Sequence, residues 1–102
     1  MSAAKTKVQG IIDDHAVAVF SKSYCPYCRA SKQLLSEQGA KAFIIELDQI
    51  DDGAAMQDAL HEITGQRTVP NIFIKQQHIG GNSDLQAKSQ ELPELLREAG
   101  AV

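Results

Sequence analysis

The two cysteines of this sequence, Cys25 and Cys28, lie three residues apart in the stretch SYCPYC, and there are no others. Two thiols at this spacing can attack, form and reopen disulfides, because both lie within one helical turn. Pro26 suits the first position of a helix, where its missing N–H would have no partner. We therefore predict a helix that begins at Pro26, with Cys25 as its N-cap and Cys28 as its third residue.

A cysteine at the N-terminus of a helix is a stronger nucleophile than a free cysteine. The free N–H groups and the helix dipole favour negative charge there, and Lys22, Arg29 and Lys32 add positive charge nearby. Thiols in such settings have pKa values of about 3.5–7.5, compared with about 8.5 for free cysteine. The sequence therefore predicts a Cys25 thiolate at neutral pH, with a less exposed Cys28 behind it. A disulfide between the two would close a very small loop and stabilise little, which favours a redox use.

Two other interpretations of the cysteine pair are a zinc site and a pair of inert buried thiols. Zinc needs four ligands, and His15, His61 and His78 are not at zinc-finger spacing from the cysteines or from one another. The C-x-x-C motif beside a strand–helix–strand pattern is typical of thiol–disulfide chemistry. We therefore predict a redox pair and no bound metal, and we expect the histidines to lie on the surface without partners.

Length and composition are those of one globular domain, expected to span residues 1–102. The net charge of −3 and a pI of about 5.5 argue against a nucleic-acid partner, which normally requires a basic face. The sequence contains no apolar run of signal-peptide or membrane-spanning length, and a secreted disulfide scaffold would contain more cysteines. These features predict a soluble, cytoplasmic monomer that binds no membrane.

Apolar patterning predicts helices that alternate with strands. Helices are expected around Val8–Ile12, from Pro26 to a stop at Gly39, after a cap at Asp51 or Asp52, and over residues 82–98 in two pieces around Pro93. Strands are expected at residues 16–20, 43–47, 71–75 and 78–80, the last two joined at Gln76-Gln77. The predicted core contains Phe20, Phe43, Phe73 and a stripe on the third helix made of Ala55, Met56, Ala59, Leu60 and Ile63.

The order of these elements predicts an α/β fold. The continuous apolar run AVAVF is typical of a strand buried on both faces, as in a parallel sheet. A strand, a helix and a strand joined by short connections form a right-handed crossover, and the last two strands form an antiparallel hairpin. We therefore expect a four-stranded mixed sheet flanked by helices on both faces.

A second motif, TVPN, places Pro70 just before a strand, where its missing N–H does no harm. About 5–6% of X–Pro bonds in folded proteins are cis, so the motif by itself favours a trans bond. Together, YCPYC, TVPNIFI and HIGGNSDL, in this order and spacing, resemble a dithiol glutaredoxin over about residues 17–85. The resemblance implies a thioredoxin-like fold in which Pro70 is cis and faces the cysteines.

The resemblance also implies a groove for glutathione. Its residues are Lys22, Tyr27, Gln66, Thr68, Val69, Pro70, Gly81, Ser83 and Asp84. In this comparison the backbone of Val69 pairs with the cysteinyl part of glutathione, Tyr27 forms one wall, and Gly80 and Gly81 allow close backbone approach. Taken alone, Gly80-Gly81 would be interpreted as a turn.

The two ends of glutathione are assigned by the same resemblance. Lys22 and Gln66 match positions that hold the glycine carboxylate, and Ser83 and Asp84 match positions that take the γ-glutamyl end. A helix N-terminus and a carboxylate suit the charges of that end. Taken alone, Lys22 and Gln66 would be solvated polar residues, and Ser83 and Asp84 a helix cap.

The implied activity is glutathione-dependent thiol–disulfide exchange on protein–glutathione mixed disulfides through Cys25, and on protein disulfides through Cys25 and Cys28. Glutathione is the expected co-substrate, and glutathionylated and disulfide-containing proteins are the expected partners. Three alternatives are a thioredoxin, an iron–sulfur scaffold and a binding module without turnover. In thioredoxins a tryptophan comes directly before the C-G-P-C motif, and this chain has no tryptophan. Pro26 argues against an iron–sulfur scaffold, and the two retained thiols argue against a binding module. The family usually has a glycine-containing turn between its last helices, which is missing here between Asp84 and Gly100.

Overall fold

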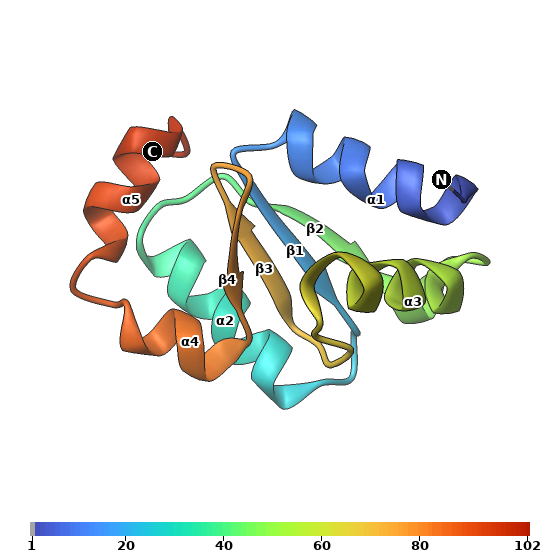
Figure 1. Ribbon diagram of the computed structural model, residues 1–102. Coiled ribbons are helices and arrows are strands. Elements are labelled where there is room, and N and C mark those ends of the chain that lie inside the picture. Colours follow the sequence, from blue (N-terminus) through green and yellow to red (C-terminus); the bar gives the residue numbers. More distant parts are fainter. Residues whose placement is uncertain (1) are drawn as a thin grey trace.

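The computed structural model describes residues 2–102 as helices that alternate with strands (Figure 1). The helices are α1 (Ala3–Asp14), α2 (Pro26–Glu37), α3 (Gly53–Thr64), α4 (Asn82–Ala87) and α5 (Leu92–Ala99), with a 3₁₀ helix η1 (Leu47–Gln49). The strands are β1 (Val17–Ser21), β2 (Phe43–Glu46), β3 (Asn71–Ile74) and β4 (Gln77–Gly80). Over this range no helix has both the length and the apolar character needed to cross a membrane.

The four strands form one mixed sheet in the order β2-β1-β3-β4. Strand β1 pairs parallel with β2 and antiparallel with β3, and β3 pairs antiparallel with β4. All five residues of β1 are buried, which reflects its central place in the sheet. The strand predicted from the apolar run at residues 16–20 is confirmed, with bounds one residue later. Ser21 is the partner of Glu46 at the ends of β1 and β2. The segments that follow these two strands therefore leave the sheet at the same edge.

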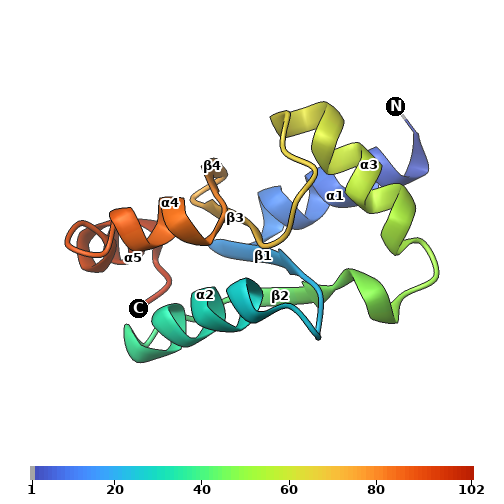
Figure 2. The same ribbon diagram turned by 90° about the horizontal axis from the view of Figure 1, so that it is seen from below.

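Helices cover both faces of the sheet, as predicted (Figures 1 and 2). Helices α1 and α3 pack on one face around Phe20, Met56 and Leu60. Helices α2, α4 and α5 pack on the other face around Leu35 and Leu96. Residues alternate between these two clusters along β1, because successive side chains of a strand point to opposite faces. The two central strands, β1 and β3, are thus enclosed, and we expect functional groups at the strand ends.

Two core predictions were wrong. Phe43 is 38% exposed because β2 is an edge strand, and its ring stacks on His15 with ring centroids 4.0 Å apart. His15 therefore has a partner, contrary to expectation. Ala55 is exposed, whereas Met56, Ala59 and Leu60 form the buried stripe of α3.

Asp52 is the N-cap residue of α3, but its side chain pairs with Lys7 at 3.0 Å instead of capping the helix.

The hairpin turn lies one residue earlier than predicted. Its central residues are Lys75 and Gln76, with φ angles of 50° and 68°. Positive φ at both central residues is the type I′ geometry that matches the twist of a two-residue hairpin. Neither is glycine or asparagine, so the sequence lacked the usual signal for this turn.

The ends of the helices follow their local signals. Gly39, with a φ of 73°, adopts the left-handed conformation after α2, as predicted. Pro93 lies in the first turn of α5, and α4 and α5 are the two predicted C-terminal pieces. Residues 88–91 connect them in tight turns, and Lys88, which ends α4, has a φ of −98°. This φ is accessible to any residue, which explains why no glycine is needed there.

Candidate active site

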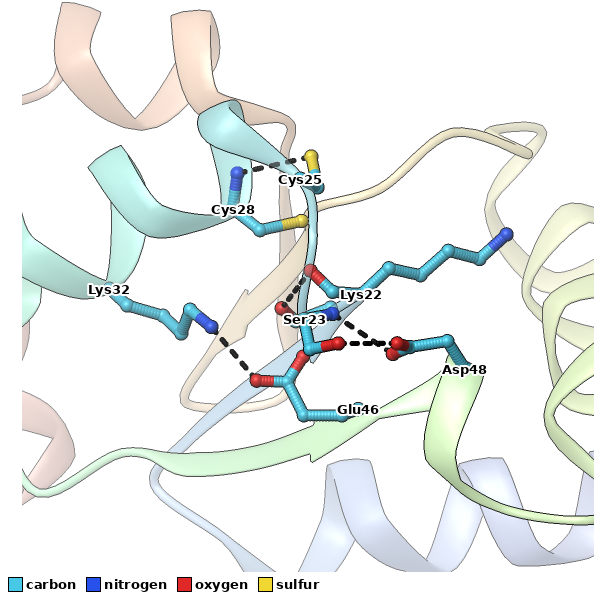
Figure 3. A network of polar contacts seen from close by, with 8 residues as sticks. Lys22, Ser23, Cys25, Cys28, Lys32, Glu46 and Asp48 are labelled. Carbon is cyan, nitrogen blue, oxygen red and sulfur yellow. Dashed lines mark hydrogen bonds and ion pairs between the residues drawn. The ribbon is translucent and has the colours of Figure 1, made fainter.

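Cys25 lies at the start of α2, in the loop that follows β1 (Figure 3). The backbone N–H of Cys28 donates to Cys25 Sγ at 3.3 Å, and the N–H of Arg29 donates to the Cys25 carbonyl at 3.1 Å. Pro26 begins the helix. Both cysteines are free thiols. The predicted N-cap geometry is confirmed, and the helix directs its free N–H groups toward the Cys25 sulfur.

The two thiols differ in burial, and their pKa values shift in opposite directions. Desolvation opposes ionisation of Cys25, but hydrogen bonds from the Cys28 thiol and from the N–H groups of Cys28 and Tyr27, with the charge of Lys32, outweigh it and lower the Cys25 pKa. Cys28 is completely buried, and this burial, followed by its hydrogen bond to Cys25, raises the pKa of Cys28. Cys25 is therefore equipped to attack as a thiolate, with a protonated Cys28 behind it.

The three basic residues predicted near Cys25 take different positions. Lys32 contributes to the low Cys25 pKa and pairs with Glu46 of β2 at 2.8 Å, with both side chains about three-quarters buried. Lys22 extends away from both thiols (Figure 3), and its charge acts on Asp48. Arg29 is exposed. One buried oxygen of Glu46, Oε1, has no hydrogen-bond partner.

The pH dependence of alkylation is the direct test of the Cys25 thiolate. Only the thiolate reacts with iodoacetamide, so the rate increases with pH through the pKa, and a lowered pKa moves the curve to lower pH. We expect the midpoint of the folded protein to lie below that of the unfolded chain, because the pKa of Cys25 is lowered. The measurement uses the Cys28→Ser variant, which has one thiol, and the urea-unfolded chain as control. A folded-state midpoint equal to that of the unfolded chain would contradict the predicted thiolate.

The loop that holds Pro70 approaches Cys25 from the opposite side. The Val69–Pro70 bond is cis, as the resemblance implied, and the Val69 carbonyl lies 3.9 Å from Cys25 Sγ. The side-chain amide of Gln66 donates to the carbonyls of Thr68 and Pro70, each at 3.0 Å. Both N–H donors of Gln66 are thus used to shape this loop, a role that the sequence did not indicate.

A buried asparagine, Asn71, supports the same loop from the side of the core. Asn71 is 1% exposed, and its Nδ2 donates to the Gln66 carbonyl at 3.4 Å and to Thr64 Oγ1 at 3.5 Å. Its Oδ1 lies 2.9 Å from Nε2 of His78, which must be the donor because Oδ1 can only accept. Partial burial lowers the pKa of His78, against the opposing charge of Asp84. His78 therefore has a partner, contrary to expectation, and a pattern of alternating apolar residues could not have revealed it.

A groove of ≈ 460 Å³ lies beside the cysteine loop. It is lined by Tyr27, Gln66, Thr68, Val69, Pro70, Gly81, Asn82, Ser83 and Asp84. Every residue predicted for the groove is among them except Lys22, and Asn82 was missed. Asn82 lies between two predicted residues, so its position was the available signal; its side-chain oxygen accepts from the buried hydroxyl of Ser31 at 2.9 Å.

The far end of the groove is formed where β4 meets α4. Gly80 has a φ of 120°, and a Cβ there would lie 2.3 Å from Asp84 Oδ2. The same oxygen accepts from the N–H of Gly81 at 2.9 Å. Gly80 thus leaves room for the Asp84 side chain, and one oxygen of Asp84 is used to hold the turn. Among residues 2–102, no three His, Cys, Asp or Glu side chains gather where they could hold a metal ion.

The fold and the site together define a thiol–disulfide oxidoreductase of the thioredoxin-like class, with a nucleophilic cysteine at a helix start facing a cis-proline loop. The glutaredoxin family model matches residues 17–79, so the chain belongs to the glutaredoxin family. It is 52% identical over 101 residues to a glutaredoxin of Ricinus communis, covering 97% of this chain and 99% of that protein. It is 47% identical over 104 residues to Glutaredoxin-C1 of Arabidopsis thaliana, covering 100% of this chain and 83% of that protein.

Solved glutaredoxin structures share the whole fold. Wheat glutaredoxin superposes with a TM-score of 0.95 at 49% identity, covering 98% of this chain and 96% of that one. A complex of buckwheat glutaredoxin with glutathione superposes with a TM-score of 0.93 at 44% identity, covering 97% of this chain and 92% of that one. The predicted thioredoxin-like fold and the predicted family are thereby confirmed.

Proposed function

We propose that this protein is a glutathione-dependent thiol–disulfide oxidoreductase that reduces protein–glutathione mixed disulfides and protein disulfides. The observation that carries the proposal is the position of Cys25. Its sulfur lies at a helix N-terminus and 3.9 Å from the carbonyl of Val69, a residue that lines the ≈ 460 Å³ groove. The buckwheat relative has been solved in complex with glutathione, which supports the same ligand here.

The first route uses one enzyme thiol. The Cys25 thiolate attacks the glutathione sulfur of a mixed disulfide, and the substrate protein leaves as a thiolate, which takes a proton from solvent. Cys25 is then joined to glutathione through a disulfide. A second glutathione attacks the glutathione sulfur of this bond as its thiolate, so oxidised glutathione leaves and the Cys25 thiolate is restored. The lowered Cys25 pKa helps both steps. It keeps Cys25 in the thiolate form that attacks in the first step, and it makes Cys25 a good leaving group in the second.

The second route uses both thiols. Cys25 attacks a protein disulfide and becomes joined to the substrate, and Cys28 then attacks Cys25 Sγ to release the substrate as a dithiol. Cys28 must lose its proton to do so, since its pKa is raised. The Cys25–Cys28 disulfide that remains is reduced by two molecules of glutathione. Cys28 can act in this way because it lies one helical turn from Cys25.

We propose that glutathione lies along the groove with its sulfur at Cys25 and its cysteinyl backbone against Val69. Tyr27 forms the outer wall, and Ser83 and Asp84 take the γ-glutamyl end, as their lining positions allow. Lys22 reaches the glycine carboxylate through its flexible side chain. Gln66 already uses its amide donors on the loop, so its proposed part is mainly to hold Thr68 and Pro70 in place.

The proposed setting follows from the chemistry. We propose a monomer as the working unit, since one pair of thiols and one groove suffice for both routes. Reduction by glutathione requires a compartment whose glutathione pool is reducing, and the cytoplasm meets this requirement. Glutathionylated and disulfide-containing proteins are the proposed substrates.

The glutathione groove is tested with Lys22→Ala and Asp84→Ala. Each variant should raise the KM for glutathione by about 10-fold in reduction of a small mixed disulfide, because a charged hydrogen bond contributes about 1.5 kcal/mol. Asp84→Asn separates ligand binding from the Gly81 contact, because an amide oxygen can still accept from that N–H. Glu62→Ala, at an exposed carboxylate of α3, is the matched control. Unchanged glutathione kinetics in both Lys22→Ala and Asp84→Ala would refute the assignment.

A further inference from the structure

The loop that carries Cys25 is held from outside by one carboxylate. The backbone N–H of Ser23 donates to Asp48 Oδ1 at 2.9 Å, and the Ser23 hydroxyl donates to Asp48 Oδ2 (Figure 3). One side chain thus accepts two hydrogen bonds from a single residue 25 positions earlier in the chain. Because the two bonds come from its N–H and its hydroxyl, they fix both the backbone and the side chain of Ser23.

The sheet explains why these two residues meet. Ser21 and Glu46 are partners at the ends of the parallel strands β1 and β2. Ser23 and Asp48 each lie two residues further along, so both leave the same edge of the sheet. Asp48 is in η1, directly after β2. The short helix turns the chain there and presents the carboxylate to the cysteine loop.

The loop has few other internal supports. Between β1 and α2, the backbone hydrogen bond within the loop runs from the Cys25 N–H to the Lys22 carbonyl at 3.1 Å. Ser23 and Tyr24 are exposed, so packing does not hold them. The N-cap position of Cys25 depends on the backbone angles of this loop, and Asp48 fixes its central part.

We propose that Asp48 is a positioning residue for the Cys25 thiolate, acting through Ser23 to keep the Cys25 sulfur at the N–H groups that begin α2. The inference rests on the proposed role of Cys25 as nucleophile. Hydrogen bonds from Ser23, first from its hydroxyl and then from its N–H, lower the pKa of Asp48. The carboxylate is therefore ionised and accepts both bonds at the pH at which the enzyme works.

A purely electrostatic role for Asp48 predicts that the Cys25 pKa changes in the opposite direction when Asp48 is replaced. The charged groups around the loop are Lys22 beside Asp48, the pair of Lys32 and Glu46, and Arg29 at the second turn of α2. If Asp48 acted only as a negative charge, its removal would stabilise a nearby thiolate and lower the Cys25 pKa. If it acts by positioning, its removal lets the sulfur leave the helix N-terminus, and the Cys25 pKa rises.

The experiment compares the pH midpoint of Cys25 alkylation by iodoacetamide in a Cys28→Ser background. Asp48→Ala and Ser23→Ala should each raise the midpoint by about 0.5–1 pH unit, which lowers the thiolate fraction about 3- to 10-fold at pH values below the midpoint. The double variant should be shifted no further than Asp48→Ala alone, because Asp48→Ala already removes the acceptor of both Ser23 hydrogen bonds. Ser23→Thr keeps the hydroxyl and should restore the original midpoint. Asp51→Ala, at an exposed carboxylate three residues from Asp48, is the matched control.

Circular dichroism establishes that each variant is folded before its midpoint is compared. Midpoints that stay unchanged or fall in Asp48→Ala and Ser23→Ala would overturn the proposal, and so would a double variant whose midpoint is shifted further than that of Asp48→Ala. Alkylation needs no glutathione. A wild-type protein inactive with glutathione would therefore refute the proposed function while leaving this measurement, and its outcome for Asp48, intact.

Discussion

Replacing Cys25 with serine is expected to abolish reduction of both glutathionylated substrates and protein disulfides, with a loss of at least about 10³-fold. Removal of a catalytic nucleophile has effects of this order or larger. A serine hydroxyl does not ionise at neutral pH, even with the N–H of Cys28 directed at it. Cys28 cannot substitute, because it is completely buried and its pKa is raised.

The measurement uses a glutathione-coupled assay with a small mixed disulfide and, separately, a protein with one intramolecular disulfide. Circular dichroism and glutathione binding by calorimetry serve as controls that the fold and the groove remain, since serine nearly matches cysteine in size. Cys28→Ser is the matched comparison, with one thiol replaced in the same helix. Turnover by Cys25→Ser above the uncatalysed rate would mean that Cys28 can attack first, and the assignment of the nucleophile would be wrong.

Replacing Cys28 with serine is expected to separate the two routes. Activity on glutathionylated substrates should be kept or should increase, because free glutathione supplies the second thiol. An increase is possible since the variant also loses a side reaction, in which Cys28 expels glutathione from Cys25 and forms the internal disulfide. Activity on an intramolecular protein disulfide should fall by about 10-fold or more, because an intramolecular thiol acts at a much higher effective concentration than a free one.

Both assays must be run on the same preparation, so that a folding defect would lower both activities and a loss of the dithiol route would lower only one. Cys28 packs in the core, and Cys28→Ala serves as a second variant that introduces no buried hydroxyl. A Cys28→Ser protein that is folded but inactive on glutathionylated substrates would establish an obligate dithiol mechanism, closer to that of thioredoxin.

Local physics explains what could be predicted along the chain. The position of Cys25 at the start of α2 follows from Pro26, which fits only the first turn of a helix. The end of α2 follows from Gly39, and the burial of β1 follows from its four consecutive apolar residues, Val17 to Phe20. In each case the decisive residues are neighbours in sequence, so their preferences can be read without knowing the fold.

The errors arose where the position of an element in the sheet decides burial. The strand with Phe43 looks like a core strand in sequence, yet it forms the edge of the sheet and exposes that ring. The apolar residues of a strand show only that the strand is suited to burial. Which strand lies in the middle depends on the pairing of β1 with β2 and β3, and that pairing is a property of the whole chain.

The sequence by itself determined the reactive pair, its helix N-terminus and the alternation of elements that carries it, because each depends on contacts between near neighbours. Resemblance of three motifs to one family then indicated the groove. Only the tertiary structure decided what supports these groups. It assigned the Gln66 amide to the cis-proline loop, Asn71 to the bond with His78, and the Asp48 carboxylate to Ser23. The physical reason is that a polar side chain can satisfy its hydrogen bonds with many partners, and the fold selects one by bringing distant strand ends to the same edge of the sheet.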